Sequence, residues 1–255
     1  MIDFERTEVW GFEHAFRGMR NPMNSWNKSD SRYCAENDHC DECILNTCNS
    51  CCSYLIGEND MNLAQKLIKG GSEHRKFLRQ IFVSVDITAP LYWWKEFDTY
   101  KVGTVANSCS TMHKIAEKAF TLEDFSREHL LNLNDSGAGF DYSCIVRDHE
   151  NKNELMNGEC VVASFECLKL IVDVLNTYRH RYLKTKDKKY WWQMIQLLPS
   201  SYNQTRTVTM TYENLLNMYR QRKSHKLDEW RVGFIEWIEN LPYAKELIMY
   251  TGEDE

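Results

Sequence analysis

The clearest pattern along the chain is a strict alternation of apolar and polar residues that begins at Ile81. The apolar positions are Ile81, Val83, Val85 and Ile87, and the polar positions on the other face are Ser84, Asp86 and Thr88. Such alternation predicts a β-strand with one buried face. Pro90 suits the first turn of a helix, and the aromatic segment LYWWKEF after it predicts a helix directly behind the strand. A strand that leads into such a helix is typical of α/β proteins.

Apolar residues at helical spacing predict most of the remaining elements. Four segments in the second half of the chain carry this period, and they are residues 162–183, 187–197, 211–222 and 227–240. In the last of these, an apolar stripe that includes Trp230 and Phe234 predicts a helix face turned to the core.

Two segments of the first two thirds have weaker patterns. Asp60 is placed to cap a helix with three apolar residues on one face, and Gly70-Gly71 is placed to end that helix. Residues 120–157 are polar and contain two glycines, so we expect a loop-rich, irregular insertion there with at most one short helix.

Length and composition favour one large folded domain. The chain has 255 residues, of which 43% are apolar and 27% charged, and no Pro-, Gly- or Ser-rich linker divides it. We therefore expect a single domain over residues 1–255, of mixed α/β (α+β) class. Its central sheet would be flanked by helices, and its C-terminal half would be mainly helical.

Net charge and hydropathy argue against two classes of partner. A formal charge of −6 argues against a broad binding surface for a nucleic-acid polymer, although a local basic pocket for a small anion is compatible with it. No window approaches 18 uninterrupted apolar residues, and the first residues, MIDFERTEVW, lack the pattern of a signal peptide. We therefore expect a cytoplasmic protein that does not bind a membrane.

Three polar stretches offer candidate chemistry. Residues 74–79 bring four basic side chains to the entry of the strand, where they suit either an anion or a solvated turn. Residues 100–111 carry many hydrogen-bond donors and acceptors over a short stretch of backbone. Such groups would suit the ring edge of a nucleotide or flavin, and a Ser/Thr-rich turn is the alternative. Residues 198–231 carry Asn217 and Arg222 on one predicted helix, and Arg suits phosphate or imide groups; a basic helix end is the alternative.

The order of these stretches resembles the flavin-dependent thymidylate synthase family. With Ala89-Pro90 as anchor, the resemblance runs without a gap from His74 to Met112. His74 falls at the family's flavin-contacting His, and Glu96 falls at a Gln that contacts the uracil nucleotide. Thr99, Tyr100 and Lys101 stand at the positions of the family's Arg-His-Arg signature, and Thr104, Asn107, Cys109, Thr111 and Met112 stand at the signature positions that follow.

The C-terminal part of the resemblance keeps the family's spacing more closely. It begins at Leu198-Pro199 and puts Asn217 at a flavin-binding Asn and Arg222 at a nucleotide-binding Arg. With a spacing one residue shorter than the family's, the segment from His225 to Arg231 then resembles the family's His-Ala-Gln-x-Glu-Ile ending.

The chain also departs from the family's signature. Lys101 is what remains of the signature's two Arg residues, Thr111 replaces its closing Arg, and Ile195 replaces an Arg ahead of Leu-Pro. Lys does not replace Arg where a planar fork grips a phosphate. A literal Arg179-His180-Arg181 lies inside a predicted helix without the Ser that should follow, so we interpret it as a chance match. A related pyrimidine substrate, or loss of catalysis, is compatible with these changes.

The resemblance implies reductive methylation of deoxyuridine monophosphate (dUMP) to thymidine monophosphate, with methylene-tetrahydrofolate as carbon donor and NADPH as reductant. FAD would be the bound cofactor, in a homotetramer that binds flavin and nucleotide between subunits. The implied catalytic residues are Thr104, Cys109 and Arg222; the flavin-binding residues are His74, Arg79, Tyr100, Lys101 and Asn217; the nucleotide-binding residues are Glu96, Asn107, Ser108, Ser110, Arg222 and His225. A non-catalytic flavin- or nucleotide-binding homologue and a zinc-dependent interaction protein are the alternatives.

A cysteine cluster lies outside this comparison. Six of the ten cysteines crowd into residues 34–52, and two C-x-x-C pairs, Cys40/Cys43 and Cys48/Cys51, offer four thiolates for tetrahedral zinc. An iron–sulfur cluster is also conceivable, and a reduced, metal-free surface loop is the alternative to metal binding. Any metal here would be structural, since the family does not require this segment.

Overall fold

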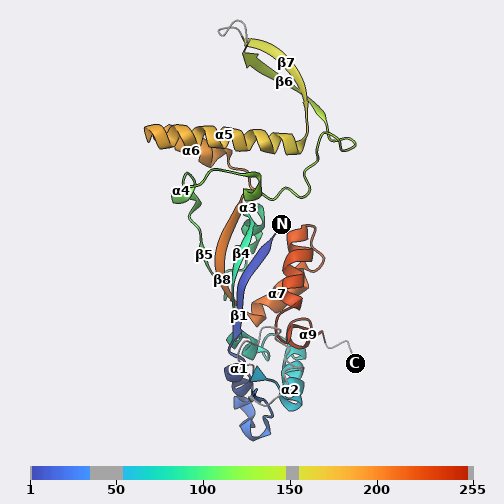
Figure 1. The fold of residues 1–255 in the computed structure, drawn as a ribbon. Helices are drawn as coiled ribbons and strands as arrows, with labels where there is room; N and C mark the ends of the chain where they lie inside the picture. Colours follow the sequence, from blue (N-terminus) through green and yellow to red (C-terminus); the bar gives the residue numbers. More distant parts are fainter. Residues whose placement is uncertain (1, 35–53, 148–154, 252–255) are drawn as a thin grey trace. The chain divides into compact units, whose positions relative to one another are not determined.

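In the computed structural model (Figure 1), the described residues are 2–34, 54–147 and 155–251. They divide into two compact units, each of which is described by itself. The sheet unit comprises Ile2–Ala89, Trp93–Ser108 and the chain from Thr205, and the hairpin unit comprises Pro90–Tyr92 and Cys109–Gln204. The expectation of one domain over the whole chain stays a prediction.

A four-stranded sheet in the order β1-β4-β8-β5 organises the sheet unit. Its strands are β1 (Asp3–Trp10), β4 (Phe82–Pro90), β5 (Val105–Ser108) and β8 (Asn203–Thr211). β1 pairs antiparallel with β4, and β5 pairs antiparallel with β8. The predicted alternation is confirmed, because Val83, Val85 and Ile87 of β4 are buried while the residues between them keep partial exposure.

Helices flank this sheet, as predicted, and short turns connect them (Figure 1). The helices are α1 (Phe12–Met19), α2 (Glu58–Lys69), α3 (Leu91–Phe97), α7 (Tyr212–Arg222), α8 (Ile235–Glu239) and α9 (Ala244–Leu247). The 3-10 turns are η1 (Asn21–Met23), η2 (Trp26–Lys28) and η4 (Lys76–Gln80), and the π-helical segment is η6 (Glu229–Phe234). A separate two-stranded sheet pairs β2 (Arg32–Tyr33) with β3 (Tyr54–Leu55). The apolar stripe predicted over residues 227–240 is confirmed as core, since Trp230, Phe234 and Ile238 are fully buried.

The start of α2 differs from the prediction. Its N-cap is Gly57, and the first backbone N–H groups of the helix donate instead to the carboxylate of Asp30, from Asn59 at 2.8 Å and from Asp60 at 3.1 Å. Asp60 is fully buried and accepts from Arg20, Ser29 and Ser31. The prediction that Asp60 caps the helix was therefore wrong, because a carboxylate from a distant segment supplies the cap and leaves Asp60 for a buried ion pair.

Two packed helices build the core of the hairpin unit. α5 (Ser164–Thr185) and α6 (Lys188–Leu197) match the helices predicted over residues 162–183 and 187–197, and the Asp187 side chain accepts from Lys189 N at 3.0 Å as the N-cap of α6. Their apolar faces meet Phe120 and Phe125 in one buried cluster. No described helix is long and apolar enough to cross a membrane.

The insertion predicted to be irregular contains a long β-hairpin. β6 (Phe140–Arg147) and β7 (Leu155–Val162) pair antiparallel, from Phe140 opposite Val162 to Arg147 opposite Leu155. The prediction was wrong for these strands, because the polar average of residues 120–157 masked an alternation in β6, where Phe140, Tyr142, Cys144 and Val146 stand at every second position. The short helix expected there is present as the 3-10 turn η5 (Leu122–Asp124), and α4 (Thr111–Lys114) precedes it.

Candidate functional site

Helix α7 positions the candidate site, and a capping box fixes where it begins. Thr211 ends β8, its hydroxyl accepts from Asn214 N at 3.3 Å, and the Asn214 side chain accepts from Thr211 N at 3.1 Å. The Asn214 amide also donates to Val102 O at 2.7 Å. Gly103 has φ 79° and passes so close that a Cβ would lie 2.8 Å from Asn214 Oδ1. The cap of α7 therefore also anchors the loop 99–104 that follows α3.

Arg222, in the last turn of α7, gathers residues from α3 and from that loop. It donates from Nε to the Tyr100 hydroxyl at 2.7 Å and from Nη1 to Glu96 Oε2 at 2.8 Å. The Tyr100 hydroxyl in turn donates to Gln221 Oε1 at 2.9 Å. The side chains of Arg222 and Glu96 are 17% and 35% exposed, so the pair lies at an accessible surface rather than in the core.

His225 completes this group from the turn after α7. Its Nδ1 accepts from Leu227 N at 3.1 Å, which places the ring proton on Nε2. Nε2 lies 3.2 Å from Glu96 Oε2, the same carboxylate oxygen that accepts from Arg222. No hydrogen bond joins the other oxygen, Glu96 Oε1, to a described residue.

The buried ring of Trp230 forms the floor under the guanidinium. The guanidinium carbon of Arg222 lies 4.7 Å from the Trp230 ring centroid and 5.3 Å from that of Tyr100. Stacking of this kind restricts a planar fork more than it would a Lys ammonium. Four of the predicted residues, Glu96, Tyr100, Arg222 and His225, thus meet in one cluster, here named the Arg222 cluster.

A buried ion pair links the basic stretch before β4 to the middle of α7. Arg75 Nε donates to both carboxylate oxygens of Glu213, at 3.1 and 3.0 Å, and the two residues are 8% and 7% exposed. Arg75 Nη2 donates to Asn217 Oδ1 at 3.1 Å. Burial lowers the pKa of Arg220 nearby, and the like charge of Arg75 acts in the same direction while Glu213 opposes it. Asn217, which the resemblance predicts to bind flavin, is therefore held by Arg75, the residue that follows His74 in the sequence.

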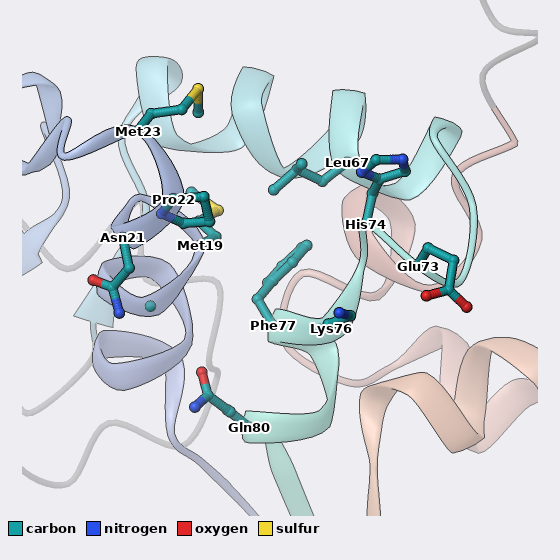
Figure 2. Close-up of a pocket in the computed structure, with 11 residues that line it drawn as sticks. Met19, Asn21, Pro22, Met23, Leu67, Glu73, His74, Lys76, Phe77 and Gln80 are labelled. Carbon is teal, nitrogen blue, oxygen red and sulfur yellow. The ribbon is translucent and has the colours of Figure 1, made fainter.

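His74 itself is exposed and lines a pocket of about 530 Å³ (Figure 2). Figure 2 shows side chains of α1 and η1 facing those of α2 and η4 across this pocket. Met19, Leu67 and Phe77 supply apolar surface, and Lys76 adds a positive charge. Among the predicted site residues, His74 alone belongs to the lining described for this pocket.

The remaining predicted residues of the sheet unit have simpler surroundings. Arg79 and Lys101 are exposed. The Thr104 hydroxyl donates to the Tyr100 carbonyl and so stabilises the loop. Asn107 and Ser108 are exposed on β5, where they pair with Thr207 and Arg206 of β8.

Two predicted residues belong to the hairpin unit. Cys109 is exposed, and its carbonyl accepts from Gln204 Nε2 at 2.9 Å. The Ser110 side chain caps α4 by accepting from His113 N at 3.2 Å. The roles that the resemblance implies for these two, and for the residues of the sheet unit, stay predictions.

Sequence reasoning missed several partners of the predicted residues. Glu213, Gln221 and Trp230 fix Arg75, Tyr100 and Arg222 respectively, yet none was among the predicted site residues. One signal was available, because Glu213 and Asn217 are four residues apart on one helix and therefore share a face.

The metal prediction rests on residues that the structure does not describe. Cys40, Cys43, Cys48 and Cys51 lie outside the described residues. Within residues 2–34, 54–147 and 155–251, no group of three or more His, Cys, Asp and Glu side chains is arranged to hold a metal ion.

Comparison with known proteins bears on the fold. No protein-family model matches the sequence, and no curated protein sequence matches it. Among solved structures, thymidylate synthase X (ThyX) from Helicobacter pylori with FAD and dUMP is 13% identical, with a TM-score of 0.57 over 97% of this chain and 96% of that chain. The UMP/dUMP methylase PolB from Streptomyces cacaoi, bound with 5-Br dUMP, is 14% identical, with a TM-score of 0.55 over 99% and 96%. The chain thus has the fold of flavin-dependent thymidylate synthases over almost its whole length.

Proposed function

We propose that the protein binds a flavin and a pyrimidine nucleoside monophosphate and methylates the nucleotide at C5 of uracil, with dUMP as the substrate. The Arg222 cluster carries this proposal, because it places a stacked guanidinium and a carboxylate at an accessible surface of a fold shared with two enzymes described as acting on or binding dUMP. UMP is the nearest related substrate, and the same cluster suits both.

Arg222 and Glu96 would recognise different ends of the nucleotide. Arg222 offers a charged fork to the phosphate, and phosphate oxygens accept two N–H groups in the plane of such a fork. Glu96 Oε2 accepts from Arg222 and lies 3.2 Å from His225 Nε2, which leaves Oε1 to accept the N3–H of uracil. Because a carboxylate only accepts, it disfavours an unprotonated ring nitrogen at that position, so it would select uracil over cytosine there.

The residues around Asn217 and His74 fit a flavin. Asn217 presents amide N–H groups from a half-buried position, and His74 lines a pocket with apolar and aromatic side chains. An acceptor-rich ring edge beside an apolar plane is what such a set recognises. FAD would supply the hydride chemistry when bound, and His74, Arg79, Tyr100, Lys101 and Asn217 would hold and orient it.

In the proposed reaction, the carbon of methylene-tetrahydrofolate forms a bond to C5, its two bonds to folate nitrogens break and tetrahydrofolate leaves, and the C5 hydrogen leaves as a proton. Two electrons from NADPH reduce the transferred carbon to a methyl group. Thr104 and Cys109 are proposed near the reacting carbon, and Asn107, Ser108 and Ser110 near the nucleotide. In this proposal the protein is a homotetramer.

A second candidate is a homologue that binds the same ligands without turnover. One observation favours it: Lys101 is what remains of the two Arg residues of the family's signature, and Thr111 replaces its closing Arg. The two candidates agree on binding and differ only in turnover.

Flavin content and nucleotide binding test the proposal without assuming turnover. The purified protein should show flavin absorption bands, or acquire them with added FAD, and dUMP should then change the flavin spectrum in a saturable way. Matched titrations with UMP and with deoxycytidine monophosphate test the role of Glu96, since we expect the cytosine nucleotide to bind at least tenfold more weakly. A protein that binds neither FAD nor dUMP would contradict the proposal.

A further inference from the structure

Arg75 determines which way the Asn217 amide faces. The two ends of an Asn amide differ in chemistry, since Oδ1 only accepts and Nδ2 only donates. A guanidinium only donates, so the end of Asn217 that lies 3.1 Å from Arg75 Nη2 must be Oδ1. The amide nitrogen therefore points away from Arg75, and no hydrogen bond joins it to a described residue.

The orientation is enforced by a buried framework rather than by a surface contact. Both carboxylate oxygens of Glu213 accept from Arg75 Nε, and each of the two side chains is 9% exposed. Glu213 and Asn217 lie four residues apart on α7, so one Arg bridges two consecutive turns of the same helix face. Rotation of the Asn217 amide would leave Arg75 Nη2 facing an N–H group in a poorly solvated position, which is strongly unfavourable.

From this geometry we infer that Arg75 and Glu213 are positioning residues that make Asn217 a dedicated hydrogen-bond donor, so that Asn217 selects an acceptor atom on the bound cofactor. In a flavin these acceptors are the ring carbonyl oxygens and unprotonated ring nitrogens. The inference rests on the proposed function, in which a flavin faces Asn217. It adds two residues, Arg75 and Glu213, to which that proposal assigns no role.

Asn217→Asp is the decisive variant, because it keeps the shape of the side chain and gains an ion pair with Arg75 but loses both N–H groups. We expect FAD affinity, measured by quenching of flavin fluorescence, to fall at least tenfold and the absorption bands of bound FAD to shift. Asn240→Asp is the matched control, since Asn240 is an exposed residue of the same unit and the substitution changes net charge equally. It should leave FAD affinity unchanged.

The double variant Arg75→Met/Glu213→Leu tests positioning separately from packing. Apolar residues of similar size replace the buried pair, an exchange that commonly preserves stability. We expect a near-normal melting temperature with a threefold to tenfold loss of FAD affinity, and no further effect of the double variant on FAD affinity in the Asn217→Asp background. If wild-type protein binds no FAD, both the proposed function and this inference are wrong. If wild type binds FAD and Asn217→Asp binds it within twofold, only this inference is wrong.

Discussion

Replacing Arg222 with Ala should weaken dUMP binding by roughly 10- to 150-fold. The guanidinium is stacked on Trp230 at 4.7 Å and is 17% exposed, so its hydrogen bonds to a phosphate would form in a partly desolvated place. A hydrogen bond to a charged group contributes about 1.5 to 3 kcal/mol, and about 1.4 kcal/mol corresponds to a factor of ten. Loss of the pair with Glu96 should cost little stability by itself, since that carboxylate is 35% exposed and well screened.

Isothermal titration of dUMP into FAD-loaded protein measures this effect. Arg222→Lys should recover part of the affinity, because it keeps the charge but not the fork. Arg231→Ala is the matched control, as Arg231 is 53% exposed and pairs locally with Asp228 at 2.6 Å. A dissociation constant for Arg222→Ala within twofold of wild type, with wild type binding normally, would remove Arg222 from the site.

Three further predictions concern stability. Asp60→Asn should lower the free energy of unfolding by about 3 to 5 kcal/mol, because it breaks a buried ion pair with Arg20; an unchanged urea midpoint would contradict this. Burial raises the pKa of Asp60, but hydrogen bonds from Ser29, Ser31 and Arg20 outweigh it and hold the pKa below its ordinary value. The ion pair therefore contributes fully to the free energy of unfolding above the ordinary Asp pKa of about 3.9, and this contribution is lost as pH falls through the pKa of Asp60 in the folded protein. On acidification, the urea midpoint of wild type should approach that of Asp60→Asn. Gly103→Ala should lower the free energy of unfolding by about 1 to 3 kcal/mol, and by more than Gly137→Ala does. Both glycines have positive φ, but of the two only Gly103 lies against another side chain, that of Asn214. Equal melting temperatures of the two variants would refute this.

Elements with a strong one-sided pattern were predictable from the sequence. β4 alternates between buried apolar and partly exposed polar residues, and the expected helix α3 begins at Leu91, directly after Pro90, which the prediction had placed in its first turn. The strands β1 and β5 of the same sheet were missed because their burial pattern is weak. β5 is exposed at all four residues, and β1 is mostly exposed as well. β8 did carry a signal, since Thr occupies every second position from Thr205 to Thr211 and β-branched residues favour strands.

The residues of the Arg222 cluster were predicted from the sequence, but their contacts with one another were not. Glu96, Tyr100, Arg222 and His225 were each named from the resemblance, and the structure brings Glu96 together with Arg222, 126 residues further along the sequence. The contact of Arg75 with Glu213 spans 138 residues and depends on how η4 packs on α7. Neither local spacing nor composition determines such a contact, because it follows from the tertiary arrangement.

Release of tritium from dUMP labelled at C5 measures the proposed methylation itself. With FAD-loaded protein, methylene-tetrahydrofolate and NADPH, we expect tritium to appear in water in step with formation of thymidine monophosphate. Omission of the folate should abolish the thymidine product, and Arg222→Ala should require much higher dUMP for the same rate. Protein that binds FAD and dUMP yet releases no tritium and forms no methylated nucleotide from dUMP or UMP would contradict the claim that it is an enzyme of this type.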